Sequence, residues 1–510
     1  MDGSGSGKSA SYSIPNAYQL LGSYVFTDPK GELYDRTAGY LKEHGYEIKV
    51  LNLVKPSNSD GYNPLMHITS EIDVDVIANT IVKGQKSEGG NADPFWDDSA
   101  EMLLKALIYY LIATRPEEEQ NLASCAELVR AANKSGGSNL LSELMSQLPY
   151  DHPARMNYKS IEIAPEKTYS SILSTLQSKL GKFDSKEIAE LTSTDTINFE
   201  EIGTKKTALY VISSDTHTAY DFLLTIFFAQ MIQQLYNFAD DNGGALKMPT
   251  YFILDEFANI GKIPDFDKKI STSRSRKISF SVILQNLDQL EAVYEKSYET
   301  IIGNCDTHVF LGSNSYKTVE YFSKALGEKT IGRDSISINK DKGNWRTGSS
   351  VSDQVMARAL MTPDELRRLD NDLCIIFEKG IKPVKANKFY YFKHPMAKEL
   401  ARLEINHNDI EDKDRGVWRK FNPYNPWTDT SENQKEAENL KVESLDDLFE
   451  DNKPEPKLDK VESMATTITS NVPEPEPATL PLDEDDSYDL QKELEAKFDE
   501  LFGPLDDENN

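Results

Sequence analysis

Two adjacent carboxylates stand at the end of an apolar run near the middle of the chain. Residues 249–257 read PTYFILDEF, so Asp255 and Glu256 directly follow the stretch from Tyr251 to Leu254. Such a run predicts a buried strand, and parallel sheets bind ligands at the carboxyl ends of their strands. Two acids placed there can hold a divalent cation and polarise a water molecule. A strand that simply leads into a capped helix would produce the same pattern.

A glycine-rich stretch near the first residue suggests phosphate binding. In GSGSGKS, the glycines let backbone N–H groups surround phosphates, while Lys8 reaches the terminal phosphates and Ser9 can ligate magnesium. The match to the pattern GxxxxGK followed by Ser or Thr is incomplete, because Asp2 stands where the first glycine belongs. A flexible Gly/Ser linker is the alternative interpretation. The predicted phosphate-binding residues are Gly3, Ser4, Gly5, Ser6, Gly7, Lys8 and Ser9.

The apolar runs around these motifs predict an α/β domain. Strands are expected at 24–27, 47–54, 207–213, 251–254, 278–284 and 307–312, with closing strands at 373–380 and 388–393. Helical patterns alternate with them, including a long apolar helix at 220–238 and a capped helix at 362–369. This alternation predicts a doubly wound parallel sheet.

Residues 96–199 show helical patterns and no strand-like run. Helices are expected at 97–113, 116–132, 138–148 and 165–182. We interpret this region as an all-α domain inserted between two parts of the α/β domain, residues 1–95 and 200–400. Such helices can serve packing alone or cover a nucleotide site.

The composition excludes several classes of protein. The three cysteines, Cys125, Cys305 and Cys374, are widely spaced, which argues against a disulfide framework or a zinc site. The most apolar stretches, 102–112 and 222–232, are too short to span a membrane, and no signal peptide precedes them. We therefore expect the chain as given to be cytoplasmic. Its metal ligands would be carboxylates and hydroxyls, which suit magnesium.

The acidic character of the chain is concentrated after residue 430. Residues 431–510 contain 7 Lys and Arg against 25 Asp and Glu, and so carry −18 of the net charge of −28. We expect 401–431 to be a connector and 432–510 a disordered acidic tail. Within the tail, 487–502 places Leu490, Leu494, Phe498 and Leu501 on one helical face, which suits folding on a partner or forms a transient helix without a role.

The motifs together resemble a known family. In order they read GSGSGKS, SYVFTDPKGEL, SDGYNPL, ALYVISSDT, YFILDEFANIGKIPDF, RSRKISFSVILQ and LMTPDELRRL, between residue 3 and about residue 380. This series is similar to that of the TraG/TraD type IV secretion coupling proteins. The resemblance implies a RecA-like P-loop motor domain with an inserted all-α domain, which binds ATP and Mg²⁺ and forms a homo-hexamer at the cytoplasmic face of the cell membrane.

The resemblance also implies partners and residue roles. The family receives relaxase-bound single-stranded DNA, or effector proteins, and contacts relaxosome accessory proteins and components of the secretion channel. Lys8 and Ser9 would bind phosphate and magnesium, and Asp255 would hold the magnesium through water. Glu256 would be the base for the attacking water, Gln285 would sense the γ-phosphate, and Arg274 would reach into a neighbouring subunit. Arg274 shares a basic segment with Arg276, so a solvated surface role is the alternative.

Two departures from the family leave other functions open. The family's transmembrane helices and the strand before its phosphate loop are missing from this sequence, so we expect a soluble portion of a coupling protein whose membrane contact lies outside it. A chromosome-partitioning DNA translocase is an alternative with related architecture. A second alternative is a substrate-recruiting adaptor with an idle phosphate loop, in which the helices and the tail bind partners.

Overall fold

The computed structural model describes residues 7–83, 94–133, 139–214, 220–339 and 348–424, with the backbone alone at residues 133, 333–339 and 348–354. All of these residues belong to one compact unit, 1–429. The predicted tail and its helix at 487–502 lie outside the described residues.

A five-stranded parallel sheet forms the centre of this unit. Its strand order is β2-β3-β1-β4-β5, and every neighbouring pair is parallel. The strands span Ser23–Thr27 (β1), Glu47–Asn52 (β2), Thr207–Ile212 (β3), Thr250–Leu254 (β4) and Ile278–Val282 (β5). Thr27 pairs with Leu254, which pairs with Val282, so three strands end side by side. This part of the predicted sheet is confirmed.

The two faces of the sheet are covered by different helices, because successive side chains of a strand point to opposite faces. Tyr24 and Phe26 face a core shared with α1 (Ile14–Ala17) and α2 (Glu32–Glu43). Val25 faces the larger core, which includes α11 (Asp221–Asp241). The shorter helices α12 (Phe266–Thr272), α13 (Leu287–Tyr294) and α14 (Tyr298–Asn304) contribute to the same larger core.

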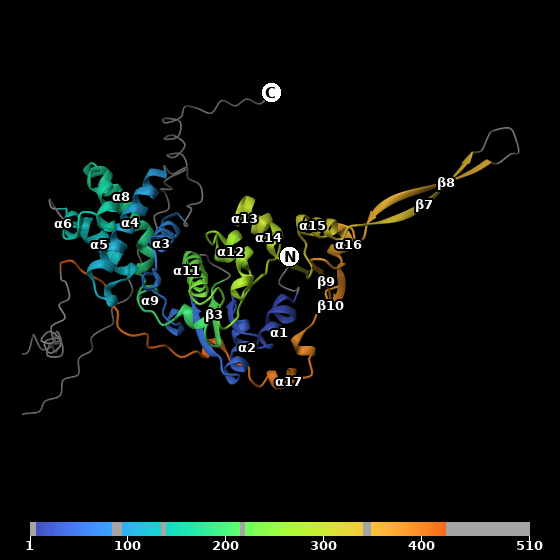
Figure 1. Ribbon diagram of the computed structural model, residues 1–510, viewed down its shortest axis with the longest axis horizontal. Coiled ribbons are helices and arrows are strands. Elements are labelled where there is room, and N and C mark those ends of the chain that lie inside the picture. The colour runs from blue at the N-terminus through green and yellow to red at the C-terminus, as the bar shows by residue number, and fades with distance from the viewer. Residues whose placement is uncertain (1–6, 84–93, 134–138, 215–219, 340–347, 425–510) are drawn as a thin grey trace, which may run out of the picture. The chain divides into compact units, whose positions relative to one another are not determined.

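Helices occupy most of the stretch between β2 and β3 (Figure 1). They are α3 (Glu71–Lys83), α4 (Pro94–Thr114), α5 (Leu122–Asn133), α6 (Leu140–Ser146), α7 (Pro153–Glu162), α8 (Glu166–Leu180), α9 (Lys186–Leu191) and α10 (Phe199–Ile202). The predicted helix at 116–132 is wrong at its start. Asn121 accepts a hydrogen bond from the N–H of Ser124 at 2.8 Å, and the helix proper begins at Leu122. The boundaries of a separate all-α domain stay a prediction.

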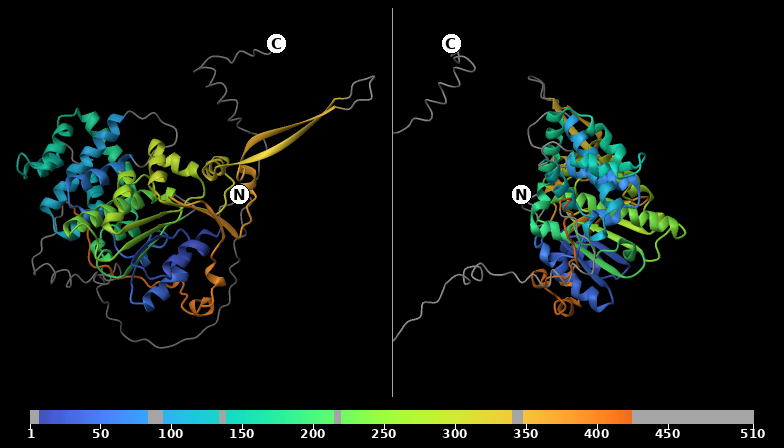
Figure 2. Two further views of the ribbon diagram at one scale, coloured as in Figure 1. Left: turned by 45° about the vertical axis from the view of Figure 1, so that its right-hand side comes forward. Right: turned by 90° about the vertical axis from the view of Figure 1, so that its left-hand side faces the viewer.

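The strands after α14 depart from the predicted sheet. β6 (Thr307–Phe310), β9 (Leu373–Glu378) and β10 (Val384–Asn387) form an antiparallel sheet of their own, which packs against α15 (Tyr316–Leu326) and α16 (Pro363–Arg367). The strand expected at 388–393 is wrong, because its aromatic side chains turn toward Gly7 and Tyr18 instead of pairing in a sheet. A ribbon of β7 (Glu328–Asn339) and β8 (Gly348–Ala359) extends away from the other elements in both figures (Figures 1 and 2).

The last described residues cross the molecule as an extended segment. Residues 401–424, which we name the C-terminal strap, follow α17 (Ala397–Leu400) and run past α2 toward α4 and α5 (Figure 1, orange). His407 pairs with Asp35 of α2 at 2.9 Å, and the N–H of Phe421 donates to the hydroxyl of Ser124 in α5 at 2.9 Å. The strap therefore joins elements far apart in the sequence. Within the described part of the chain, no helix is both long and apolar enough to cross a membrane.

Candidate active site

The twin acids lie at the carboxyl edge of the parallel sheet. Asp255 and Glu256 follow β4 immediately, and the chain turns there because Glu256 adopts a left-handed backbone conformation with φ of 51°. Non-glycine residues in this conformation concentrate at functional sites. The N–H of Phe257 donates to the carbonyl of Ile283 at 3.0 Å, which fixes the turn against the end of β5. The sheet thus presents both carboxyl groups at its rim.

The phosphate-loop residues meet these acids. Lys8 Nζ lies 2.9 Å from Oε1 of Glu256, and their side chains are 10% and 20% exposed. The hydroxyl of Ser9 donates to Oδ2 of Asp255 at 3.3 Å. The four residues come from stretches 246 and 248 positions apart in the chain. Two motifs that the sequence could only pair by resemblance are therefore neighbours in space.

Gln285 completes this group from the end of β5. Its Nε2 donates to Oε1 of Glu256 at 2.9 Å, so Glu256 accepts hydrogen bonds from Lys8 and Gln285 at one oxygen. Hydrogen bonds of this charge-assisted kind are stronger than those between neutral groups. The end of β5 is tied to the helical turn after the phosphate loop, since the hydroxyls of Tyr12 and Ser281 lie 2.8 Å apart.

The electrostatics of Asp255 differ from those of Glu256. Burial raises the pKa of Asp255 above its ordinary value, and the adjacent Glu256 adds to this rise while Lys8 opposes it. The carboxyl group also accepts from the N–H of Glu256 at 3.1 Å. Burial removes the water that would stabilise the negative charge of Asp255, and Lys8 replaces it only in part. A divalent cation beside Asp255 would supply the missing stabilisation, with the Ser9 hydroxyl as a second oxygen ligand.

Of the other predicted groups, one lies outside the described residues, and one, within them, has no hydrogen bond or ion pair with this cluster. Residues 3–6 of the phosphate loop lie outside the described part, so the loop is seen only from Gly7 onward. Arg274 lies exposed on the short turn Arg274–Arg276, and within the described residues no hydrogen bond or ion pair connects its guanidinium to Lys8, Asp255 or Glu256. The neighbouring Arg276 pairs with Asp240 at 2.9 Å and covers the ring of Tyr236.

The structure adds two residues that the motifs did not indicate. The hydroxyl of the buried Thr27 donates to the carbonyl of Asp255 at 2.7 Å and so orients the acidic turn from the neighbouring strand. Tyr390 packs against Gly7, where a methyl group on the glycine would lie 2.9 Å from its ring. Thr27 closes the SYVFT strand, and its place beside Asp255 follows only from the strand order β1-β4.

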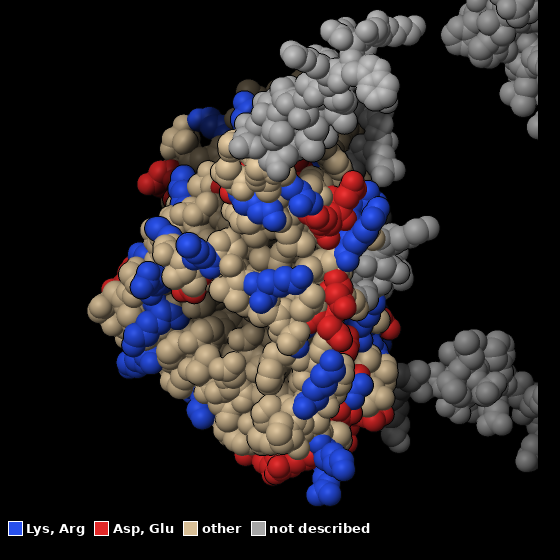
Figure 3. Space-filling view, turned by 90° about the vertical axis from the view of Figure 1, so that its right-hand side faces the viewer, with Lys and Arg blue, Asp and Glu red and all other residues tan. Residues whose placement is uncertain are grey.

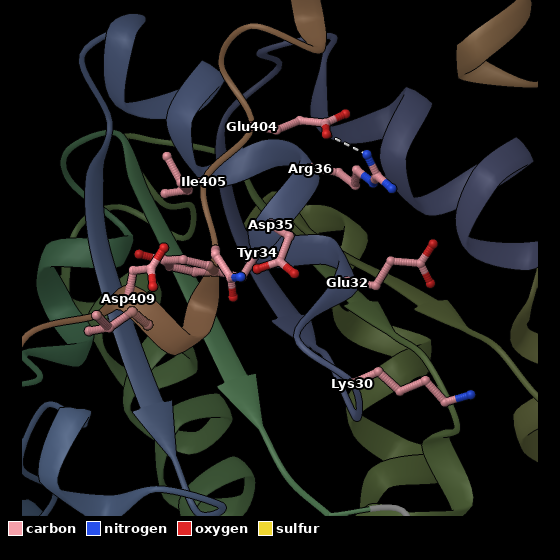
Figure 4. A pocket seen from close by; sticks show the side chains of 10 residues that line it. Lys30, Glu32, Tyr34, Asp35, Arg36, Glu404, Ile405 and Asp409 are labelled. Atoms are coloured by element: carbon pink, nitrogen blue, oxygen red, sulfur yellow. Dashed lines mark ion pairs between the residues drawn. The ribbon is translucent and has the colours of Figure 1, made fainter.

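A separate groove lies between the start of α2 and the C-terminal strap (Figure 4). It encloses about 790 Å³, and Lys30, Glu32, Asp35, Arg36, Glu404 and Asp409 supply its charged groups. Arg36 pairs with Glu404 across it. None of the predicted site residues lines this groove, and its mixture of charges indicates no particular ligand.

The sheet order, the helix after Gly7 and the acids after β4 define a RecA-like α/β fold with an added set of helices. The chain belongs to the family of type IV secretory system conjugative DNA transfer proteins, whose sequence profile matches residues 1–414. It is 25% identical over 449 residues to the conjugal transfer protein TraG of Escherichia coli, covering 81% of this chain and 69% of TraG. To VirD4 of Rhizobium rhizogenes it is 24% identical over 418 residues, which cover 78% of this chain and only 59% of VirD4.

A solved structure shares the fold. The plasmid coupling protein TrwB, in complex with the non-hydrolysable ATP analogue ADPNP, superposes with a TM-score of 0.53 at 16% sequence identity. The superposition covers 76% of this chain and 83% of TrwB. The predicted RecA-like fold with inserted helices is thereby confirmed for the described residues.

Proposed function

We propose that this chain is the ATPase core of a type IV secretion coupling protein. It recruits relaxase-bound single-stranded DNA, or effector proteins, and drives or gates their delivery to the conjugative secretion channel at the cytoplasmic face of the membrane. One observation carries the proposal: Lys8 and Ser9 lie against Glu256 and Asp255 at the carboxyl edge of a parallel sheet. The names of the relatives, and the ATP analogue bound to TrwB, support it.

The residues divide the work of hydrolysis among them. Gly7 and Lys8 bind the phosphates, so the ammonium of Lys8 exchanges Oε1 of Glu256 for phosphate oxygens. Glu256, still held by Gln285, then accepts a proton from the attacking water. Ser9 and Asp255 would hold magnesium, which would supply positive charge against the phosphate oxygens. Because Arg274 is exposed, it is available to the site of a neighbouring subunit in a hexamer.

The substitution Glu256→Gln tests the assignment of the base. We expect it to lower the rate of ATP hydrolysis, measured as phosphate release in the presence of single-stranded DNA, by roughly 10²-fold or more. ATP binding should persist, because the amide keeps the shape of the side chain and Lys8 loses a competing carboxylate. Glu187→Gln, on the exposed surface of α9, is the matched control and should hydrolyse ATP at the parent rate.

A Glu256→Gln variant that hydrolyses ATP at the parent rate would remove Glu256 from the mechanism. Absence of nucleotide binding by the parent chain would contradict the whole proposal and favour the adaptor function. If the parent chain hydrolyses ATP, stimulation of the rate by single-stranded DNA distinguishes a DNA motor from an ATPase that serves protein substrates alone.

A further inference from the structure

Four consecutive aromatic residues pass beside the candidate site after β10. They are Phe389, Tyr390, Tyr391 and Phe392. Tyr390 is buried at 9% exposure, whereas the rings of Phe389 and Phe392 are 58% and 55% exposed. An exposed aromatic ring offers a flat apolar face on which a ligand can stack.

Tyr390 is wedged between the phosphate loop and the antiparallel sheet. Its ring lies against Gly7, whose φ of 72° and close contact leave no room for a side chain. Its hydroxyl donates to the carbonyl of Asn371 at 3.2 Å, and the ammonium of Lys393 lies 4.6 Å from its ring centroid. Tyr390 is therefore fixed from both sides and cannot easily turn away.

Phe392 extends this contact outward. Its ring stacks on Tyr390 with the centroids 5.1 Å apart and an angle of 22° between the planes. Gly7, Tyr390 and Phe392 thus form a continuous series that leads from the phosphate loop to an exposed aromatic ring. The neighbouring Tyr391 instead turns toward Tyr18, at 6.4 Å between centroids, and packs with the core beneath α2.

We propose that the ring of Phe392 is the platform on which the base of the bound nucleotide stacks. This inference rests on the proposed function, because the phosphates must be held at Gly7, Lys8 and Ser9 for the base to arrive beside Phe392. Stacking on a fixed aromatic ring is strong and tolerates different bases, since every base presents a flat face. The site therefore takes nucleoside phosphates with little discrimination between their bases, adenine and guanine included.

Phe389 provides a matched control on the same segment. It is as exposed as Phe392, but its ring contacts His394 edge-on at 5.9 Å and takes no part in the stack on Tyr390. A general effect of removing surface aromatic area from this segment should therefore appear equally at Phe389 and Phe392.

The experiment compares the binding of ADP, GDP and inorganic pyrophosphate by titration calorimetry on the full chain. Phe392→Ala should weaken the binding of ADP and GDP roughly tenfold and leave that of pyrophosphate unchanged. Phe392→Trp should retain nucleotide affinity, and Phe389→Ala should bind all three ligands as the parent does. Lys8→Ala should weaken all three together, because it acts on the phosphates.

The outcomes separate the two proposals. A parent chain that binds pyrophosphate, combined with a Phe392→Ala variant of unchanged ADP affinity, overturns the stacking platform and leaves the phosphate site in place. Equal weakening of ADP and pyrophosphate by Phe392→Ala also overturns it, because the ring would then act through the loop. A parent chain that binds none of the three ligands overturns the proposed function itself.

Discussion

At the scale of single residues, the site depends on contacts between strands as much as on its motifs. Glu256 shares one oxygen between Lys8 and Gln285, and Thr27 fixes the backbone of Asp255 from the next strand. Each of these hydrogen bonds joins residues far apart in the sequence. The positions of the acids therefore depend on the register of β1, β4 and β5.

Asp28, directly after Thr27, makes the stability of the fold depend on pH. It is 2% exposed and accepts a hydrogen bond from the N–H of Tyr34 at 2.8 Å at the start of α2. Burial raises its pKa from 3.8 to about 7. The folded chain therefore keeps a proton that the unfolded chain releases. This stabilisation is complete below the unfolded pKa and is lost as the pH rises through about 7.

We predict that Asp28→Asn, which cannot ionise, flattens this dependence. Between about pH 5 and about pH 8 the variant should lose less of its free energy of unfolding than the parent, by on the order of 2 kcal/mol. Urea denaturation at the two pH values measures the difference. Asp364→Asn, at an exposed position in α16, should follow the parent, and parallel curves for Asp28→Asn would contradict the prediction.

At the scale of elements, the C-terminal strap joins α5 and α9 to α2 and to the turn after β2. Phe421 is 3% exposed in the larger core and lies under the guanidinium of Arg115, 4.3 Å from its centre. Arg415, also buried, donates to the carbonyl of Pro56 at 2.8 Å and pairs with Glu190 of α9 at 3.0 Å. The strap thus contributes apolar packing and ion pairs to the helices, and a hydrogen bond to the turn after β2.

Phe421→Ala should lower the free energy of unfolding by about 3 kcal/mol, because it empties a buried aromatic site. It should also expose α4 and α5 to limited proteolysis before the sheet is cut. Val417→Ala removes an 80% exposed side chain from the same strap and should change stability by less than ~0.5 kcal/mol. Equal stability of the two variants would show that the strap does not hold the helices.

Elements that bury continuous apolar runs could be predicted from the sequence, and others could not. The strands β1, β3 and β4 fall where their apolar residues predict them, because a central parallel strand is buried on both faces. β10 is mostly exposed and polar, so the more aromatic stretch after it looked like the strand. The ribbon of β7 and β8 lacks an apolar run, and α7 begins at Pro153 within a stretch assigned to no element.

Only some residues of the candidate site could be predicted from the sequence. Residue type and spacing identify four candidates in the sequence, namely Asp255, Glu256, Lys8 and Ser9. Thr27 and Tyr390 have no such signal, since a strand threonine and a tyrosine in an aromatic run usually serve packing. Their contacts with Asp255 and Gly7 depend on strand order and on the path of the chain after β10, which local patterns do not contain.

At the scale of the whole molecule, charge is divided between the described unit and the tail. Residues 431–510 hold −18 of the net −28, so the rest of the chain is only mildly acidic. On the face shown in Figure 3, Lys and Arg side chains predominate on the left-hand side, while most Asp and Glu side chains lie to the right and along the lower edge. Local basic areas of this kind can hold nucleic acid despite an acidic total.

Removal of residues 431–510 should therefore strengthen the binding of single-stranded DNA, because it takes away −18 of the net charge of −28, which repels the phosphate backbone. We expect roughly threefold to tenfold tighter binding at low salt, measured by fluorescence anisotropy, and no difference at about 0.5 M salt. A full-length variant whose tail acids are replaced by their amides should behave like the truncated chain. Unchanged affinity at low salt would show that the charge of the tail does not influence DNA binding.

The path of the strap also determines the order in which its contacts would break under a pull from its C-terminal end. Counted from the C-terminal end, the first contacts are those of Tyr424, Phe421 and Arg419 with residues 118–131. The ion pairs of Arg415 and Lys413 follow. The contact between His407 and Asp35 comes last. Tension applied at the C-terminal end of the strap would break these contacts in that order. The contacts with the helices would break while α2 stayed attached, so the force would reach the candidate active site only after the outer contacts had broken.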